Sequence, residues 1–285
     1  MSLFVNNNGD VLKAVLPTIN AGSRGYLFGD GVFESIRIFK GKPINVENHI
    51  KRILEGAKAL KIRCASYYDA PFFKEKIIEL LEKSAIKEGG RCRLSIDRVN
   101  GGTYFPVSND SAFYIEVYPF EHATYELNTK GLEIDIYRDI KIQKNFLSNY
   151  KTKACINYIM AAIAAKEKNL DDVLISNDKG NILETSSCNV FVVSNGVLYT
   201  PGLDEGCLAG TMRMQIINLA IKNGIKVYEC NILPQNLLSA DEIFITNAIR
   251  GINWVGGYRT KRFYNNLSKK LVTLLNEYWI SKIEN

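Results

Sequence analysis

Leu147-Ser148-Asn149-Tyr150-Lys151-Thr152 is the stretch from which the organisation of this chain is read most directly. It stands at the head of residues 152–168, whose apolar spacing predicts a helix. The acidic pair Asp171-Asp172 follows and introduces the apolar run 173–175, which predicts a buried strand. A helix followed by a buried strand indicates a mixed α/β fold, and the position before the helix singles out Lys151.

A second informative stretch is Leu183-Glu184-Thr185-Ser186-Ser187-Cys188-Asn189-Val190-Phe191. Small polar residues after Glu184 precede a strand predicted at 188–194, and Gly210 opens a helix predicted at 211–223. Pyridoxal 5'-phosphate needs an amine for its aldehyde, a charge partner for its ring nitrogen and donors for its phosphate. The sequence therefore predicts a pyridoxal phosphate enzyme in which Lys151 forms the Schiff base and Glu184 faces the ring nitrogen.

Other readings of these residues stay open at this point. Lys153 lies two residues from Lys151 and competes for the same role. Glu184 follows Asp178-Lys179-Gly180-Asn181, a plausible hairpin, and would then be an ordinary turn residue.

Three segments are candidates for binding the phosphate. Backbone N–H groups at a helix start favour an anion, and an arginine can clamp one through two N–H groups. The candidates are Arg52 in a predicted helix, Gly210, Thr211 and Met212 at a helix start, and Thr246, Asn247 and Ala248 after a predicted buried strand. Each is common in proteins, so it is their order along the chain that makes the set specific.

The composition excludes several other classes of protein. The net charge is +6, but the lysines are dispersed among acidic residues, which argues against a nucleic-acid interface. Six cysteines without a Cys-x-x-Cys pair and only two histidines argue against a metal site. Residues 1–5 lack a charged start, and no apolar run reaches ~18 residues, so we expect no membrane span and a reducing cytoplasm.

The pattern of elements predicts two domains. Strands are expected at 33–39, 93–99, 112–118, 132–137, 172–176, 188–194, 197–200 and 240–246, and helices at 48–60, 72–81, 152–168, 211–223 and near 267–278. The polar stretch 119–128 breaks the pattern. We therefore predict a smaller N-terminal α/β domain, 1–120, and a larger C-terminal one, 121–285, that carries Lys151. Mostly antiparallel sheets with flanking helices are expected, with the cofactor between the domains.

Beyond these patterns, the chain resembles the class IV aminotransferases, the fold type IV pyridoxal phosphate enzymes, over nearly its whole length. This family includes branched-chain and D-amino acid aminotransferases and aminodeoxychorismate lyase. The matching segments are Arg24–Glu34, Glu47-x-His49-x-x-Arg52, Lys151-Thr152, Glu184–Phe191, Gly196–Pro201 and Leu208–Arg213. The family's distance from the lysine to the acidic pair agrees with Lys151, whereas Lys153 shortens it by two.

The chain also departs from the family pattern. Met212 stands where the family often has a threonine, so only its backbone amide carries over. Ala154 replaces an asparagine common three residues after the lysine, and Asn247-Ala248 is closer to the lyases. The Arg-x-His carboxylate trap of D-amino acid aminotransferases is absent from 101–106, and Phe33 stands where those enzymes carry a tyrosine.

The resemblance implies an aminotransferase with a branched-chain-like preference and 2-oxoglutarate as amino acceptor. Its partners would be a small amino acid and a 2-oxo acid, and the chain would form a homodimer. The residues expected to contact the substrate are Phe33, Arg93, Arg98 and Arg250. The alternative is a 4-amino-4-deoxychorismate lyase, which eliminates to give 4-aminobenzoate and pyruvate; Asn247-Ala248 favours it, and Phe33 with Glu34 favours transamination.

Overall fold

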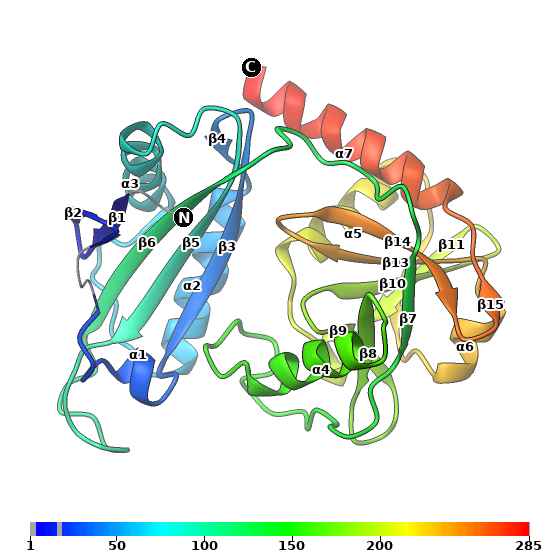
Figure 1. Cartoon of the computed structure of the whole chain (residues 1–285), viewed down its shortest axis with the longest axis horizontal. Helices are drawn as coiled ribbons and strands as arrows, with labels where there is room; N and C mark the ends of the chain where they lie inside the picture. Colours follow the sequence, from blue (N-terminus) through cyan, green and yellow to red (C-terminus); the bar gives the residue numbers. More distant parts are fainter. Residues whose placement is uncertain (1–3, 16–18, 285) are drawn as a thin grey trace. The chain divides into compact units, whose positions relative to one another are not determined.

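The computed structural model describes residues 4–15 and 19–284, so residues 1–3 of the N-terminal stretch lie outside it. Helices and strands are mixed along the chain, which confirms the predicted mixed α/β class (Figure 1). The chain divides into two compact units. The first comprises Met1–Thr124 with Tyr150–Ala154, and the second Tyr125–Asn149 with Cys155–Asn285.

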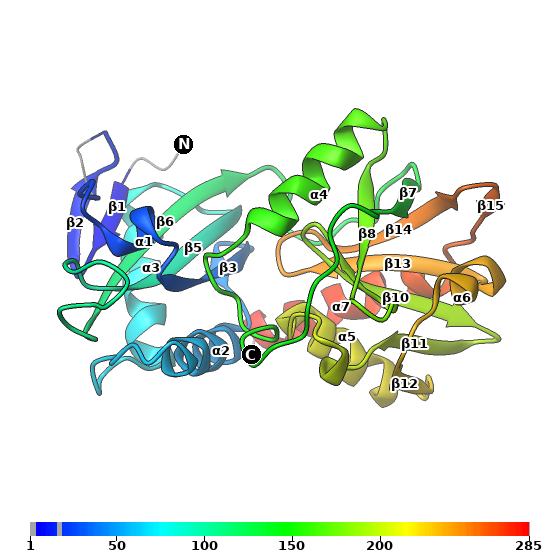
Figure 2. The same ribbon diagram turned by 90° about the horizontal axis from the view of Figure 1, so that it is seen from below.

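The first unit is a sheet in which neighbouring strands are antiparallel, in the order β2-β1-β6-β5-β3-β4. The strands are β1 (Phe4–Asn7), β2 (Asp10–Lys13), β3 (Gly31–Phe39), β4 (Lys42–Pro43), β5 (Gly89–Arg98) and β6 (Ser111–Phe120). Its helices are α1 (Arg24–Leu27), α2 (Val46–Ala59) and α3 (Ala70–Lys83), and α2 runs along one side of the sheet (Figure 2).

The two faces of this sheet differ because side chains alternate along a strand. Every second residue of β3, β5 and β6 enters the core with the apolar sides of α2 and α3; the strand members are Val32, Ile36, Ile38, Cys92, Leu94, Ile96, Phe113, Ile115 and Val117. The intervening residues are largely polar and lie on the other face. In register they form the rows Phe33-Ser95-Tyr114 and Ser35-Arg93-Glu116.

The second unit contains a sheet that closes on itself. Strands β10, β13, β14, β7, β8 and β9 follow one another, and β9 pairs back with β10. The strands are β7 (Leu132–Ile136), β8 (Asp172–Ser176), β9 (Ile182–Thr185), β10 (Asn189–Ser194), β11 (Val197–Pro201), β12 (Val227–Cys230), β13 (Glu242–Asn247), β14 (Gly251–Tyr258) and β15 (Lys261–Arg262). The pairs β7–β8, β7–β14 and β11–β12 are parallel and the others antiparallel, as expected for a mostly antiparallel fold.

Five helical segments belong to the second unit. They are α4 (Ile156–Glu167), the short η1 (Leu203–Glu205), α5 (Thr211–Lys222), α6 (Pro234–Ser239) and α7 (Asn266–Glu284). Helix α4 packs on β8, and α5 and α7 pack on β13 (Figure 1). In the part of the chain that the structure describes, no helix is long and apolar enough to cross a membrane.

The helix predicted from residue 152 begins later, at Ile156. Residues 150–154 lie at the edge of β3, where Thr152 forms an isolated bridge with Val32: Phe33 N donates to the Lys151 carbonyl at 3.0 Å, and Lys153 N donates to the Gly31 carbonyl at 2.9 Å. These backbone groups cannot also make helical hydrogen bonds. The segment Tyr150–Ala154 accordingly groups with the first unit, whose continuous part ends at Thr124.

Candidate functional site

The bridge between Thr152 and Val32 fixes the direction of two lysines. Thr152 lies opposite Val32, so Lys151 and Lys153 project to the same side of the sheet as Phe33. The Lys151 Nζ lies 4.5 Å from the centre of the Phe33 ring. The Lys153 Nζ lies 2.5 Å and 2.7 Å from the two carboxylate oxygens of Asp97. Lys153 is therefore engaged in an ion pair with Asp97 within the first unit.

Arg52 is held by a buried carboxylate on the opposite, α2 side of β3. Its Nε and Nη2 each donate to Glu34 at 2.6 Å, and His49 Nδ1 lies 2.6 Å from the same carboxylate. Burial by itself would raise the pKa of Glu34, but the charges of Arg52 and His49 outweigh burial and lower it to about 2. Glu34 therefore fixes the position of the guanidinium that the sequence assigned to the phosphate.

This pKa predicts how acid affects the fold. Because the folded value of about 2 lies below the usual 4.5, ionised Glu34 stabilises the protein at neutral pH, and this stabilisation is lost as pH falls from 4.5 towards 2. Glu34→Gln should lower the free energy of unfolding at pH 7 by about 3 kcal/mol and flatten its pH dependence in that range. Denaturant titration across pH measures both. The exposed Glu47→Gln is the control, and equal effects of the two substitutions would contradict the assignment.

In the second unit, Glu184 lies where the sheet closes. Glu184 pairs with Asn189 on β10, and Asn189 pairs with Thr246 on β13, so the three side chains share one face. Glu184 is 3% exposed; it accepts hydrogen bonds from the Tyr158 hydroxyl at 2.8 Å and from Leu208 N at 3.1 Å. Burial and the neighbouring Glu184 charge raise the pKa of Tyr158, so this phenol stays a donor. Glu184 is thus a strand residue and not a turn residue.

The loop before α5 is hydrogen-bonded to Asn189, which lies on the same face as Glu184 and Thr246. Asn189 Nδ2 donates to the Leu208 carbonyl at 2.9 Å, and a β-carbon on Gly210 would lie 1.9 Å from Asn189 Oδ1. Only glycine therefore allows this approach. Helix α5 begins at Thr211 without a side-chain cap, and Thr211 and Met212 are buried. First-turn N–H groups of a helix have no partner within the helix, and their dipoles favour an anion.

In the turn after β13, the side chain of Asn247 makes hydrogen bonds to other groups of the protein. Asn247 Oδ1 accepts from Ile249 N at 3.0 Å and Arg250 N at 2.8 Å, and its Nδ2 lies 3.1 Å from Cys188 Sγ. The Ala248 carbonyl accepts from Tyr125. Thr246 differs: its hydroxyl oxygen is buried and has no hydrogen-bond partner among the described residues. A buried hydroxyl is seldom left unpaired, so Thr246 fits a group that is absent from the protein chain itself.

The residues expected to contact the substrate lie in different surroundings in the structure. The Arg93 guanidinium lies 3.9 Å from the centre of the Phe33 ring, which Lys151 Nζ also approaches, so these three residues form one group around that ring. Arg250 is exposed in the second unit and donates to Ser187 Oγ at 3.3 Å.

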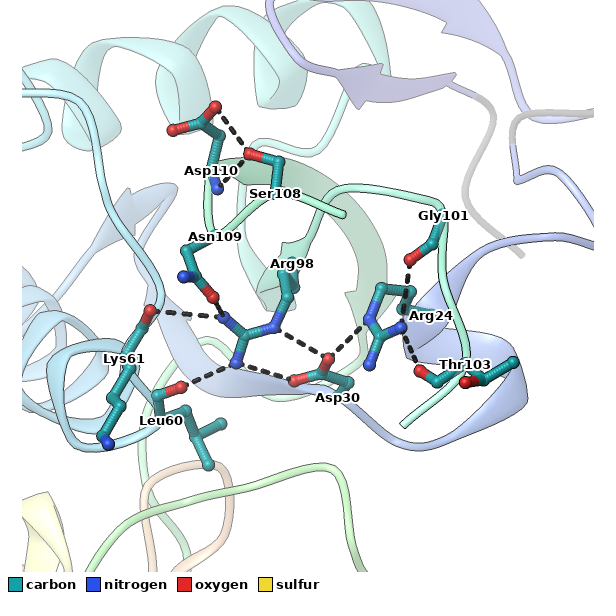
Figure 3. A network of polar contacts seen from close by, with 10 residues as sticks. All are labelled: Arg24, Asp30, Leu60, Lys61, Arg98, Gly101, Thr103, Ser108, Asn109 and Asp110. Atoms are coloured by element: carbon teal, nitrogen blue, oxygen red, sulfur yellow. Dashed lines mark hydrogen bonds and ion pairs between the residues drawn. The ribbon is translucent and has the colours of Figure 1, made fainter. Parts of the chain in front are cut away.

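Arg98, by contrast, is a structural residue. All five of its N–H donors are engaged, by Asp30, the Leu60 and Lys61 carbonyls and Asn109 (Figure 3). Asp30 also accepts from Arg24 Nε at 2.8 Å, and Arg24 holds the carbonyls of Gly101 and Thr103. This network fastens the loop after β5, and it leaves Arg98 no donor for a substrate carboxylate.

The sequence did not predict the contacts that Glu34, Asp97, Tyr158 and Asn189 make in these groups. A signal existed for Glu34, since a carboxylate inside the apolar run 32–38 needs a buried partner. The others carry no local pattern because their partners are distant in sequence. No group of three or more His, Cys, Asp or Glu residues that would hold a metal ion occurs within residues 4–15 and 19–284.

Solved structures share this fold. A branched-chain aminotransferase from Thermoproteus uzoniensis, crystallised with norvaline, superposes with a TM-score of 0.87 at 23% identity, over 96% of this chain and 93% of that one. An aminotransferase from Brucella abortus bound to PLP gives 0.86 at 24% identity, over 98% and 99%. A putative 4-amino-4-deoxychorismate lyase from Legionella pneumophila gives 0.84 at 24% identity, over 93% and 96%. These likenesses confirm the predicted fold type.

Curated relatives and a family model extend the likeness to sequence. The chain is 29% identical to a putative branched-chain-amino-acid aminotransferase of Methanocaldococcus jannaschii over 84% of its length and 82% of the relative's. It is also 29% identical to a D-alanine aminotransferase of Listeria monocytogenes, over 99% and 96%. The model of amino-transferase class IV matches residues 31–255. Because this model covers most of the chain and the fold agrees with it, the chain belongs to amino-transferase class IV, a family of pyridoxal phosphate-dependent enzymes.

Proposed function

We propose that the chain transfers the amino group of a branched-chain-like amino acid to 2-oxoglutarate, with Lys151 as its covalent and proton-transferring residue. The observation that carries this proposal is the group of Lys151, Phe33 and Arg93, in which an apolar ring lies 3.9 Å from a guanidinium and 4.5 Å from an amine. The ring suits an apolar side chain, and the guanidinium suits the carboxylate of an acidic partner such as 2-oxoglutarate.

The residues of each unit fit the chemical needs of pyridoxal phosphate. When bound, the cofactor supplies a carbonyl carbon for the substrate amine and a ring that spreads the electron pair left at the α-carbon. Lys151 would hold it covalently. Glu184 would set a buried negative charge at the ring nitrogen, and its two fixed donors keep the carboxylate in place. Arg52, the backbone N–H groups that open α5 from Gly210 through Thr211 and Met212, and Thr246 followed by Asn247-Ala248 would receive the phosphate.

Lys151 also moves a proton in this proposal. When bound to neither cofactor nor substrate, the Lys151 Nζ would take the proton from the substrate α-carbon, hold it as an ammonium and return it to the former carbonyl carbon of the cofactor. Phe33 keeps the amine beside an apolar surface, and Phe33 itself is 9% exposed. Arg93, on the neighbouring strand, orients the substrate through its carboxylate.

A panel of amino acids with 2-oxoglutarate tests the proposal. We expect higher kcat/KM for leucine, isoleucine and valine than for D-alanine, measured as glutamate formed. A higher kcat/KM for D-alanine would contradict the assignment of a branched-chain-like substrate.

The lyase alternative rests on Asn247-Ala248, which lies in the turn after β13. Pyruvate and 4-aminobenzoate formed from 4-amino-4-deoxychorismate, without amino transfer to any 2-oxo acid, would establish the lyase.

Thr246 gives a direct test of the phosphate assignment. Thr246→Val exchanges an unpaired buried hydroxyl for a methyl group of similar size, so the fold should be as stable as before or slightly more so. Loss of one hydrogen bond to a charged phosphate should weaken pyridoxal phosphate binding by about tenfold or more. Equilibrium titration measures this. Pyridoxal, which lacks the phosphate, is the control and should bind both proteins equally; unchanged affinity for pyridoxal phosphate would remove Thr246 from the site.

We further propose that the chain is a homodimer in a cytoplasmic compartment. Support for association comes from α4, where Ile156, Ile159, Met160 and Ile163 are 40–65% exposed in the single chain and follow one helical face. The side of α4 toward β8 buries alanines instead. Light scattering should give twice the 32.1 kDa chain mass, and a mass of one chain at micromolar concentration would contradict the proposal.

A further inference from the structure

Asn189 is a buried residue of β10 to which the proposed reaction gives no role. It is 5% exposed and lies in register between Glu184 on β9 and Thr246 on β13. Neighbouring strands are about 4.8 Å apart, so the backbones at the two ends of this row are about 10 Å apart. Glu184 has a buried carboxylate at one end, and Thr246 has an unpaired buried hydroxyl at the other. The row therefore joins the residues assigned to the ring nitrogen and to the phosphate.

Leu208, in the loop before α5, is hydrogen-bonded to two members of this row. Its N–H donates to Glu184 Oε2 at 3.1 Å, and its carbonyl accepts from Asn189 Nδ2 at 2.9 Å. The same carbonyl accepts from Gly210 N at 2.8 Å, which closes a tight turn immediately before the helix. The backbone of one loop residue thus connects the Glu184 carboxylate with the start of α5.

The other polar atom of the Asn189 amide lies against Gly210. A β-carbon on Gly210 would lie 1.9 Å from Asn189 Oδ1. Gly210 has a φ of −66° and a ψ of 132°, which any residue adopts, so the closeness of Asn189 and not the backbone conformation accounts for glycine here. The amide therefore sets how near the first turn of α5 comes to β10, because one atom holds the loop and the other limits its approach.

We propose that Asn189 is a positioning residue that makes the site selective for the phosphorylated cofactor, by placing the first turn of α5 beside the row of Glu184 and Thr246. Helix-start N–H groups favour an anion only within about one turn of the helix end, so a small displacement of α5 costs hydrogen bonds to the phosphate. The Glu184 carboxylate stays on β9 when α5 moves. This inference rests on the proposed roles of Glu184 and of the start of α5.

Equilibrium titration with two forms of the cofactor tests this role. The Kd for pyridoxal divided by the Kd for pyridoxal phosphate measures the selectivity for the phosphate, and the lysine linkage that both compounds form cancels from this ratio. Asn189→Ala should lower the selectivity at least ~10-fold, because each hydrogen bond lost to a charged group weakens binding by about that factor or more. The Kd for pyridoxal should change little.

Asn181→Ala is the matched control. Asn181 is also 5% exposed, and its Nδ2 donates to Glu205 Oε2 at 2.7 Å, in the same loop but away from the start of α5. We expect this variant to lose stability in denaturant titration, as Asn189→Ala does, and to keep the wild-type selectivity. An equal fall in selectivity in the two variants would mean that Asn189 only supports the loop, which would overturn the positioning role.

The close contact between Asn189 and Gly210 gives a second test. Gly210→Ala should push α5 away from Asn189 and lower the selectivity about tenfold or more, the range for overpacking a buried contact. In the Asn189→Ala background the same substitution meets no amide oxygen and only the milder approach to Arg213 Cβ at 3.2 Å, so its effect should be much smaller. Two effects that simply multiply would contradict the role of this contact.

The outcomes for Asn189 and for the proposed function are distinct. Wild type that binds pyridoxal phosphate no more tightly than pyridoxal would overturn the phosphate assignment of the proposed function itself. Selectivity that falls in Thr246→Val but not in Asn189→Ala would overturn the positioning role of Asn189 and leave the proposed function standing. Circular dichroism checks that each variant folds.

Discussion

Lys151→Ala should abolish the covalent attachment of pyridoxal phosphate and lower kcat at least ~10³-fold, because one residue supplies both the covalent bond and the proton transfer. Lys151 is half-buried over Phe33 and lies in a segment whose backbone is tied to β3, so alanine leaves the strand pairing intact. The fold should persist and bind the cofactor without a bond.

Absorbance after cofactor addition, borohydride reduction and steady-state rates measure this effect together. Lys144→Ala, at an exposed lysine of the same stretch, is the matched control and should behave as wild type. If Lys151→Ala keeps its covalent cofactor and the linkage disappears when Lys153 is replaced, the assignment of Lys151 is wrong. Exogenous methylamine should restore part of the lost rate only if the missing group is an amine that moves a proton.

Glu184→Gln should lower kcat by about 10²–10³-fold, the range seen when a fixed charge or dipole that stabilises a transition state is removed. Glutamine has the same shape, and its amide oxygen can still accept from Leu208 N or the Tyr158 hydroxyl, so the sheet closure at Glu184 and Asn189 should hold. What is lost is the negative charge that would keep the ring nitrogen protonated.

Comparing Glu184→Gln with Tyr158→Phe separates the effect of the Glu184 charge from the effect of its orientation. Tyr158→Phe removes one hydrogen bond to Glu184 and keeps its charge, so we expect a loss of only about fivefold. Rates and unfolding curves for both variants separate chemistry from folding. Equal losses in the two variants would show that orientation of the carboxylate, and not its charge, matters; a Glu184→Gln enzyme with wild-type kcat would refute the role altogether.

The loop after β5 shows how a residue of the right type can be assigned wrongly from sequence. Arg98 has the charge to bind a carboxylate, and its position in a predicted strand gave no reason to exclude it. Its donors are used by Asp30, 68 residues earlier, and by carbonyls at the end of α2 and just beyond it. The number of donors left over is a property of the fold, which no local pattern contains.

The amino-acid sequence by itself determined what local pattern and family motifs contain. Apolar periodicity located β3, α2, α3, β8 and β10 to within a few residues, because burial of one face imposes that period. The motifs determined the family and its cofactor. The order of Lys151, Glu184 and Gly210 indicated which residue types to examine.

Only the tertiary structure decided what depends on partners far apart in the chain. The helix after Lys151 begins at Ile156 because the preceding backbone groups pair with β3, a competitor that helix periodicity does not record. Glu34 fixes Arg52, Asn189 brings Gly210 beside the sheet, and Asp97 engages Lys153. Each of these contacts joins residues 18 to 56 positions apart, so no local sequence pattern contains them.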